Sequence, residues 1–141
     1  MIWLVSLVLG LLTCPLVSNV PTGAIDPSWG FAMHAWFSGS AGHVPVTSFT
    51  YGPLGFLTVP VLWGTWTYLL ALVFVLGVQV VLCRLLLARI NAVAPWWVAL
   101  IGTFVMAALV DVYVAETFLV TVALLAAHLL QNGVQEERRW L

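Results

Sequence analysis

The chain has 141 residues, of which 63% are hydrophobic and only 6% are charged, and its formal net charge is -1. Soluble domains carry about 25% charged residues, so this composition excludes a soluble globular protein and predicts a membrane protein. The charge also excludes the basic surface that nucleic-acid binding requires. Cys14 and Cys83 lie in separate apolar runs without a histidine at ligand spacing, and they indicate neither a disulfide framework nor a zinc site.

The first apolar run, residues 2–17, predicts a first transmembrane helix. At ~1.5 Å per residue it rises about 24 Å, slightly less than a hydrocarbon core of about 30 Å. No basic residue precedes the run, which favours a retained helix over a cleaved secretory signal. The Leu-Leu-Thr-Cys string that ends at Cys14 resembles a lipoprotein cleavage site, but the Thr before the cysteine argues against that alternative.

A connection of unusual length, residues 18–65, follows the first span, and long connections are usually functional or disordered. Its composition indicates order. Asp26 as N-cap and Pro27 as the first helical residue predict a short helix over residues 27–38. Four apolar side chains form one stripe of this helix: Trp29, Met33, Trp36 and Phe37. Such a helix is typical of the membrane interface.

Two further apolar runs predict three more spans. Residues 66–90 form the clearest transmembrane helix. The apolar stretch after it is too long for one crossing and has two acids at its middle, so a hairpin at residues 111–116 would divide it into spans at residues 95–110 and 114–130. Five tryptophans near the predicted span ends fit an aromatic belt: Trp63, Trp66, Trp96, Trp97 and Trp140. The fold class is therefore an all-α bundle of about four spans.

The arginines predict the orientation of this bundle. With a cytoplasmic N-terminus, all four lie on the cytoplasmic side: Arg84, Arg89, Arg138 and Arg139. This topology satisfies the positive-inside rule, puts residues 131–141 in the cytoplasm and makes the loop 18–65 extracytoplasmic. Five polar side chains then gather on the outer side: Asp26, His34, His43, Asp111 and Glu116.

Two strings in the long loop resemble motifs of the GT-C superfamily of membrane glycosyltransferases. They are Asp-Pro-Ser-Trp at residues 26–29 and Phe-Thr-Tyr-Gly-Pro-Leu-Gly at residues 49–55. The similarity is closest to bacterial integral membrane proteins of the protein-mannosyltransferase-like kind. It implies an enzyme of the bacterial inner membrane that transfers a sugar from a polyprenyl-phosphate donor to an extracytoplasmic acceptor. Membrane lipid and the lipid-linked sugar would be its partners.

The resemblance also implies roles for single residues. Asp26 matches the first-loop acid, which activates or orients the acceptor nucleophile. Glu116 matches the second-loop acid, which in metal-dependent members helps to hold a divalent cation such as Mg²⁺ or Mn²⁺, and Asp111 is its rival. Three further side chains are candidates for substrate contact: His34, His43 and Tyr51.

Each candidate also has a purely structural explanation. Asp26 before Pro-Ser is an ordinary N-cap, and Asp111 and Glu116 fit solvated residues at a membrane surface. His34 lies off the apolar stripe and fits a solvent-exposed histidine better than a ligand. Gln79, in the middle of the second span, predicts a hydrogen bond between helices.

The length of the chain bears on the expected activity. Members of the superfamily are several times longer and have more spans, so the chain is expected to be an N-terminal part that is inactive alone. The outer face has no Arg or Lys for a lipid phosphate, and a further phosphate clamp is expected elsewhere in the whole enzyme. The alternative is a noncatalytic membrane protein, such as an assembly partner or a transporter fragment.

Overall fold

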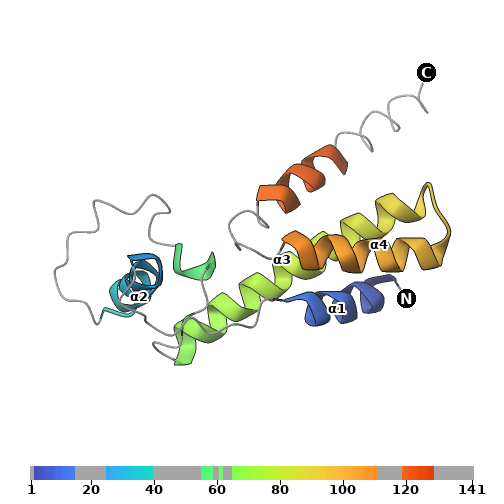
Figure 1. Ribbon diagram of the computed structural model, residues 1–141. Helices are drawn as coiled ribbons and strands as arrows, with labels where there is room; N and C mark the ends of the chain where they lie inside the picture. The colour runs from blue at the N-terminus through green and yellow to red at the C-terminus, as the bar shows by residue number, and fades with distance from the viewer. Residues whose placement is uncertain are drawn as a thin grey trace, which may run out of the picture. The chain divides into compact units, whose positions relative to one another are not determined.

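The computed structural model describes residues 2–14, 25–39, 55–58, 61, 65–110 and 119–128 (Figure 1). Its elements are α1 (Ile2–Thr13), α2 (Ile25–Phe37), the 3-10 helix η1 (Gly55–Thr58), α3 (Thr65–Asn91), α4 (Trp96–Leu109) and a further helix at Leu119–His128. Every element in these residues is helical, so the predicted all-α class is confirmed. The chain divides into two compact units, one of Met1–Cys14 and Leu76–Leu141 and the other of Pro15–Val75.

α3 is the one described helix that is long and apolar enough to cross a membrane. It has 27 residues, which rise about 40 Å at ~1.5 Å per residue, and its bounds lie within one residue of the predicted span at 66–90. A tight turn ends it, in which the backbone N–H groups of Val93 and Ala94 both donate to the carbonyl of Ile90. Pro95 then precedes α4, where its missing N–H costs no helical hydrogen bond.

The other apolar helices are shorter than the spans predicted for them. α1 has 12 residues and α4 has 14, which rise about 18 Å and 21 Å, against a hydrocarbon core of about 30 Å. The helix Leu119–His128 lies inside the predicted span at 114–130. The predicted hairpin at residues 111–116 lies outside the described residues. The four-span arrangement therefore stays a prediction.

In the first unit, α1 runs antiparallel to the part of α3 that it contacts (Figure 1). Near the start of α1, the ring of Trp3 lies beside the guanidinium group of Arg84. At the end of α1, the hydroxyl of Thr13 is 2.9 Å from the side-chain nitrogen of Gln79, which lies earlier on α3. The first two apolar helices thus have opposite directions, as consecutive membrane crossings require.

α4 also runs antiparallel to α3 and therefore parallel to α1. Gly102 faces Ile90, near the end of α3, because a Cβ at Gly102 would lie 3.2 Å from the Cδ1 atom of Ile90. Further along α4, the carbonyl of Ala107 accepts a hydrogen bond from Gln79. The starts of α1 and α4 therefore lie toward the arginine-bearing end of α3, and their ends lie toward Gln79.

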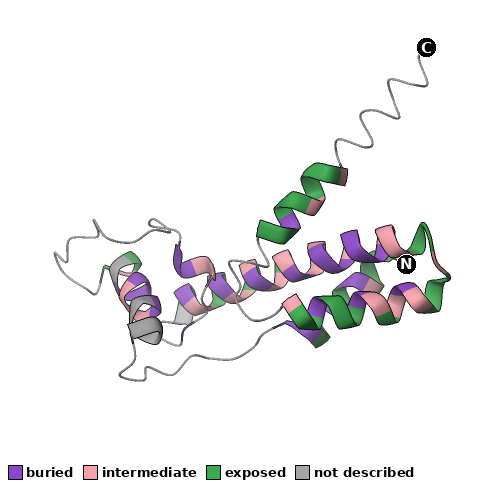
Figure 2. Cartoon of the chain, turned by 45° about the horizontal axis from the view of Figure 1, so that its top comes forward, coloured by how far each residue is buried: buried purple, intermediate pink, exposed green. Residues whose placement is uncertain are grey.

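Small side chains line the inner faces of α1 and α4. The buried residues of α1 include Ser6, Gly10 and Thr13, and those of α4 are Ala99, Thr103 and Ala107, one turn apart. Large apolar side chains on both helices are exposed instead (Figure 2), among them Leu4, Leu11, Leu12, Ile101, Val105 and Leu109. Small residues at helix contacts and large apolar residues outside are typical of helix packing in membranes.

In the second unit, α2 packs against η1. Met33 and Phe56 are almost fully buried, and the ring of Phe37 stacks on Phe56 at a centroid distance of 4.2 Å. Phe37 also contacts Trp66, in the first turn of α3, at 5.5 Å. Ser38 closes the end of α2 by donating its backbone N–H to the carbonyl of His34. These contacts tie α2, η1 and the start of α3 into one aromatic cluster.

α2 begins at Ile25, two residues before the predicted start at Pro27. Asp26 therefore lies in the first turn, and the prediction that it is the N-cap is wrong. The first helical N–H groups have no partner within the helix, so Pro27 is tolerated there without losing a hydrogen bond. An acidic residue in this turn is also favoured by the helix dipole. Whether α2 lies in a membrane interface stays a prediction.

Candidate functional site

The predicted site residues differ in how much of them the structure describes. Asp26 is placed by its backbone in the first turn of α2, and its side chain lies outside the described part. Four further candidates lie outside the described residues altogether: His43, Tyr51, Asp111 and Glu116. His34 is the one candidate with a described side chain. The roles that the resemblance implies for these residues therefore stay predictions.

His34 is buried, with 0% of its surface exposed, so its predicted place on a wet surface is wrong. Its ring meets the ring of Phe56 edge to face at a centroid distance of 5.4 Å. The physical reason is η1, which covers this side of α2 although it lies well beyond α2 in the sequence. The imidazole is thus a packed part of the aromatic cluster, and a ligand would have to displace the Phe56 ring to reach this edge.

The cation implied for the site would need carboxylate ligands. Glu116 and Asp111, its predicted ligands, lie outside the described residues. Within the described ranges, no three His, Cys, Asp or Glu side chains gather at a distance suited to a metal ion. The described part of the chain therefore supplies no observation on which a metal-dependent step could be built.

Gln79, near the middle of α3, forms hydrogen bonds with both α1 and α4, and we call this contact of three helices the crossing at Gln79. Its side-chain amide donates to the Thr13 hydroxyl at 2.9 Å, to the Thr13 carbonyl at 3.4 Å and to the Ala107 carbonyl at 3.1 Å. The predicted hydrogen bond between helices at Gln79 is therefore confirmed. The Thr13 hydroxyl in turn donates to the carbonyl of Leu9, so it both accepts and donates a hydrogen bond.

Sequence reasoning missed Thr13 as the partner of Gln79. Thr13 continues a row of small residues on α1, after Ser6 and Gly10, and this spacing is the signal that marks a close helix contact. The crossing brings together the ends of two helices. α1 ends at Thr13 and leads into the segment that carries Asp26, whereas α4 ends shortly after Ala107 and leads into the segment of Asp111 and Glu116.

We expect Gln79→Leu to lower the free energy of unfolding by about 0.6 to 1.7 kcal/mol, the usual range for a hydrogen bond between membrane helices. The change keeps a side chain of similar size but removes the bonds to Thr13 and Ala107. The measurement is unfolding in mixed detergent and dodecyl sulfate micelles. A cycle with Thr13→Val isolates the side-chain bond, and strictly additive losses from the two substitutions would contradict a direct interaction.

Comparison of the chain with protein-family models, with curated proteins and with solved structures finds no match.

Proposed function

We propose that the chain is a membrane-embedded helix bundle and the N-terminal part of a GT-C-like glycosyltransferase, which transfers a sugar from a polyprenyl-phosphate donor to an extracytoplasmic acceptor. The support for membrane embedding is the distribution of side chains. Ser6, Thr13, Gln79 and Thr103 are buried, while large apolar residues on α1, α3 and α4 are exposed. Such an exposed apolar surface suits lipid and not water.

The crossing at Gln79 is the observation that carries the enzymatic part of the proposal. One amide holds the end of α1 beside the end of α4. In the sequence, Asp26 follows α1, and Asp111 and Glu116 follow α4. A general base must come within about 3 Å of the proton that it takes, so the proposal requires Asp26 and Glu116 to face the same acceptor and donor.

The roles proposed for the acids follow from their chemistry. Asp26 accepts the proton of the acceptor nucleophile, since a carboxylate is the base that this part of the chain offers. Glu116, with Asp111 as its rival, faces the phosphate that leaves from the donor. A divalent cation held by such oxygens would neutralise the charge on that phosphate. Gln79 has no chemical role and acts as a positioning residue.

Lipid analysis of cells that lack the gene tests this proposal, and it works for any donor sugar. When a transferase is removed, its lipid-linked donor is no longer consumed. We therefore expect one polyprenyl-phosphate sugar to accumulate in the deletion strain and to return to the normal level when the whole gene is restored. If the levels of all polyprenyl-linked sugars stay unchanged while the membrane protein is present in the parent strain, the noncatalytic alternative is correct.

A further inference from the structure

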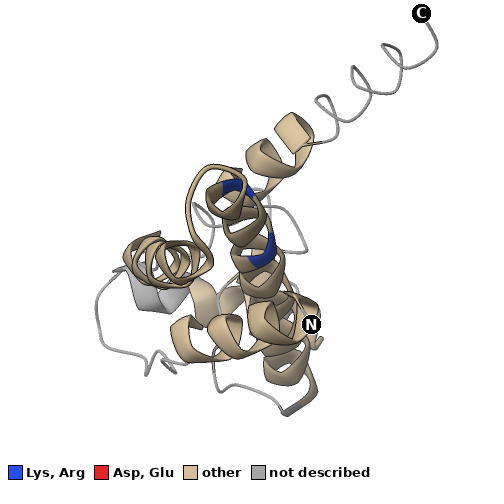
Figure 3. Cartoon of the chain, turned by 90° about the vertical axis from the view of Figure 1, so that its right-hand side faces the viewer, with Lys and Arg blue, Asp and Glu red and all other residues tan. Residues whose placement is uncertain are grey.

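A cationic and aromatic pair lies where α1 begins. The guanidinium carbon of Arg84, on α3, is 5.5 Å from the centroid of the Trp3 ring. Trp3 is 62% exposed, and Arg84 is half-buried. The Nε atom of Arg84 is covered by protein and has no hydrogen-bond partner within the described residues. The described part of the chain contains no Asp or Glu side chain that could pair with Arg84. The two arginines of α3 are the blue residues in Figure 3.

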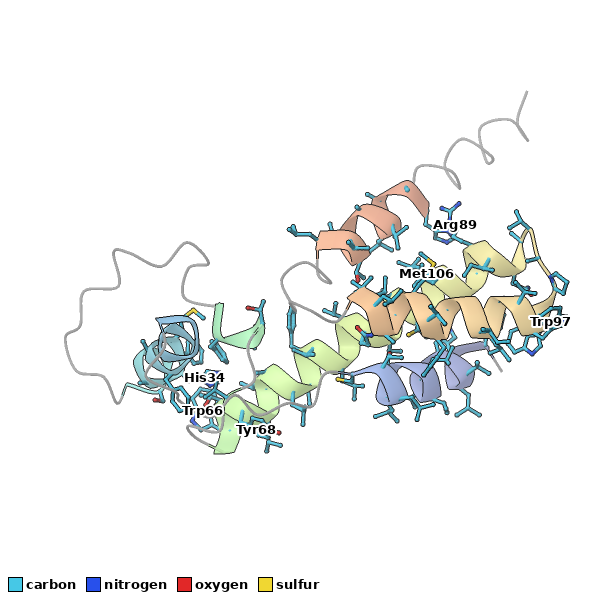
Figure 4. All side chains as sticks on the ribbon, viewed as in Figure 1. His34, Trp66, Tyr68, Arg89, Trp97 and Met106 are labelled. Carbon is cyan, nitrogen blue, oxygen red and sulfur yellow. The ribbon has the colours of Figure 1, made fainter. Side chains whose placement is uncertain are left out.

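The depth of the pair follows from the length of the apolar stretch before it. Residues 66–83 of α3 rise about 27 Å, close to the thickness of the hydrocarbon core, so Arg84 comes at its edge. Trp97, at the start of α4, is 64% exposed toward the same end of α3 (Figure 4). Exposed tryptophans and arginines at the end of an apolar stretch are typical of the headgroup level of a membrane.

The chemistry of the pair selects its ligand. A guanidinium group presents a planar set of N–H donors that matches phosphate oxygens, and the Arg84 side chain is only half-buried, beside the exposed ring of Trp3. Leu4 and Leu7, near Trp3 on α1, expose apolar surface that suits acyl chains. A free phosphate would leave this surface uncovered, whereas a phospholipid covers it and supplies the phosphate.

We propose that Arg84 and Trp3 form a binding site for the phosphate headgroup of an anionic membrane lipid. The ring of Trp3 holds the guanidinium group in place, and the acyl chains lie along the exposed side chains of α1. This inference rests on the membrane embedding in the proposed function but not on sugar transfer. The site is at the arginine-bearing end of α3, whereas the proposed acids follow the opposite ends of α1 and α4.

Native mass spectrometry of the full chain in detergent, titrated with phosphatidylglycerol or phosphatidylcholine, tests the site. We expect phosphatidylglycerol to bind more tightly. Arg84→Gln should weaken its binding about fivefold, the effect of one cation near a membrane surface, and Trp3→Leu about two- to fivefold. Arg84→Lys keeps the charge but not the planar donor set and should fall between the wild type and Arg84→Gln.

Two substitutions at the same end of the bundle serve as matched controls. Arg89→Gln removes the same charge and Trp97→Leu the same ring, but neither residue belongs to the pair of Arg84 and Trp3, so each should weaken lipid binding less than Arg84→Gln does. Equal losses from Arg84→Gln and Arg89→Gln would overturn the site in favour of unspecific charge attraction. Equal binding of the two lipids would overturn it as well.

Two further measurements distinguish a lipid site from a site for free phosphate and from a failure of membrane embedding. Inorganic phosphate in excess should not displace phosphatidylglycerol, and displacement by it would show a site for free phosphate instead. Extraction of cell membranes with alkaline carbonate should leave the wild type and every variant in the pellet. Release of the chain into the supernatant would show that membrane embedding itself is wrong. Retention in the pellet with loss of lipid selectivity would show that only the lipid site is wrong.

Discussion

Replacing Asp26 by Asn in the whole enzyme is expected to lower sugar transfer by about 100-fold or more, the usual contribution of a general base. Asn has almost the same shape as Asp, and loss of the favourable charge at the helix start costs only about 0.3 to 1 kcal/mol, so the first turn of α2 should still form. The substitution therefore removes the charge and the basicity but keeps the local structure. The measurement is restoration of the normal donor level in the deletion strain.

Ser28→Ala is the matched control for Asp26→Asn, since it changes another polar side chain in the same turn of α2. It should restore the donor level fully. Glu116→Gln should fail to restore it if this residue faces the donor phosphate, and Asp111→Asn should fail if the rival assignment is correct. Full restoration by Asp26→Asn would show that Asp26 only supports the start of the helix, and the proposed base would then be wrong.

Gly10→Leu is expected to disrupt the contact between α1 and α3. A Cβ at position 10 would lie 2.7 Å from the Cγ2 atom of Val80 and 3.2 Å from the Cα and N atoms of Val80. The Val80 side chain can rotate, but the backbone behind it cannot, so α1 has to move away. We expect the free energy of unfolding to fall by about 1 to 3 kcal/mol. The hydrogen bond between Gln79 and Thr13 should be lost as well.

Gly77→Leu is the control, because Gly77 lies on α3 with nothing within 4 Å of an added Cβ. It should be neutral or stabilising, since Leu favours a helix by about 0.5 to 1 kcal/mol relative to Gly. Unfolding in mixed micelles measures both variants. Val80→Ala removes the nearest atom and should recover part of the loss caused by Gly10→Leu. Equal stability of the variants at positions 10 and 77 would contradict the close contact between α1 and α3 at Gly10.

The elements that the sequence can predict are those with strong local signals. The predicted span at 66–90 agrees with α3 to within one residue at each end, because a long apolar run bounded by polar residues leaves few alternatives. The helix at Ile25–Phe37 overlaps the one predicted over residues 27–38, since its apolar spacing is helical. Its predicted start is two residues late because Pro is tolerated at more than one position of a first turn.

Contacts between distant segments cannot be predicted from the sequence. Local periodicity puts His34 off the apolar stripe and so predicts a wet surface, whereas Phe56 covers it from η1. The periodicity of one helix holds no information on what packs against its other faces. The position of Gln79 predicts a bond to another helix, but its partners Thr13 and Ala107 follow from how α1 and α4 pack.

Cysteine labelling in intact cells tests most directly whether α3 crosses the membrane. In a background with Cys14→Ala and Cys83→Ala, the substitution Ser38→Cys places a thiol in the segment before α3, and Ala92→Cys places one in the turn after it. An impermeant maleimide added outside should label Ser38→Cys at once, and Ala92→Cys only after the membrane is permeabilised. Labelling of both positions from the same side would contradict the crossing and with it the proposed outer site.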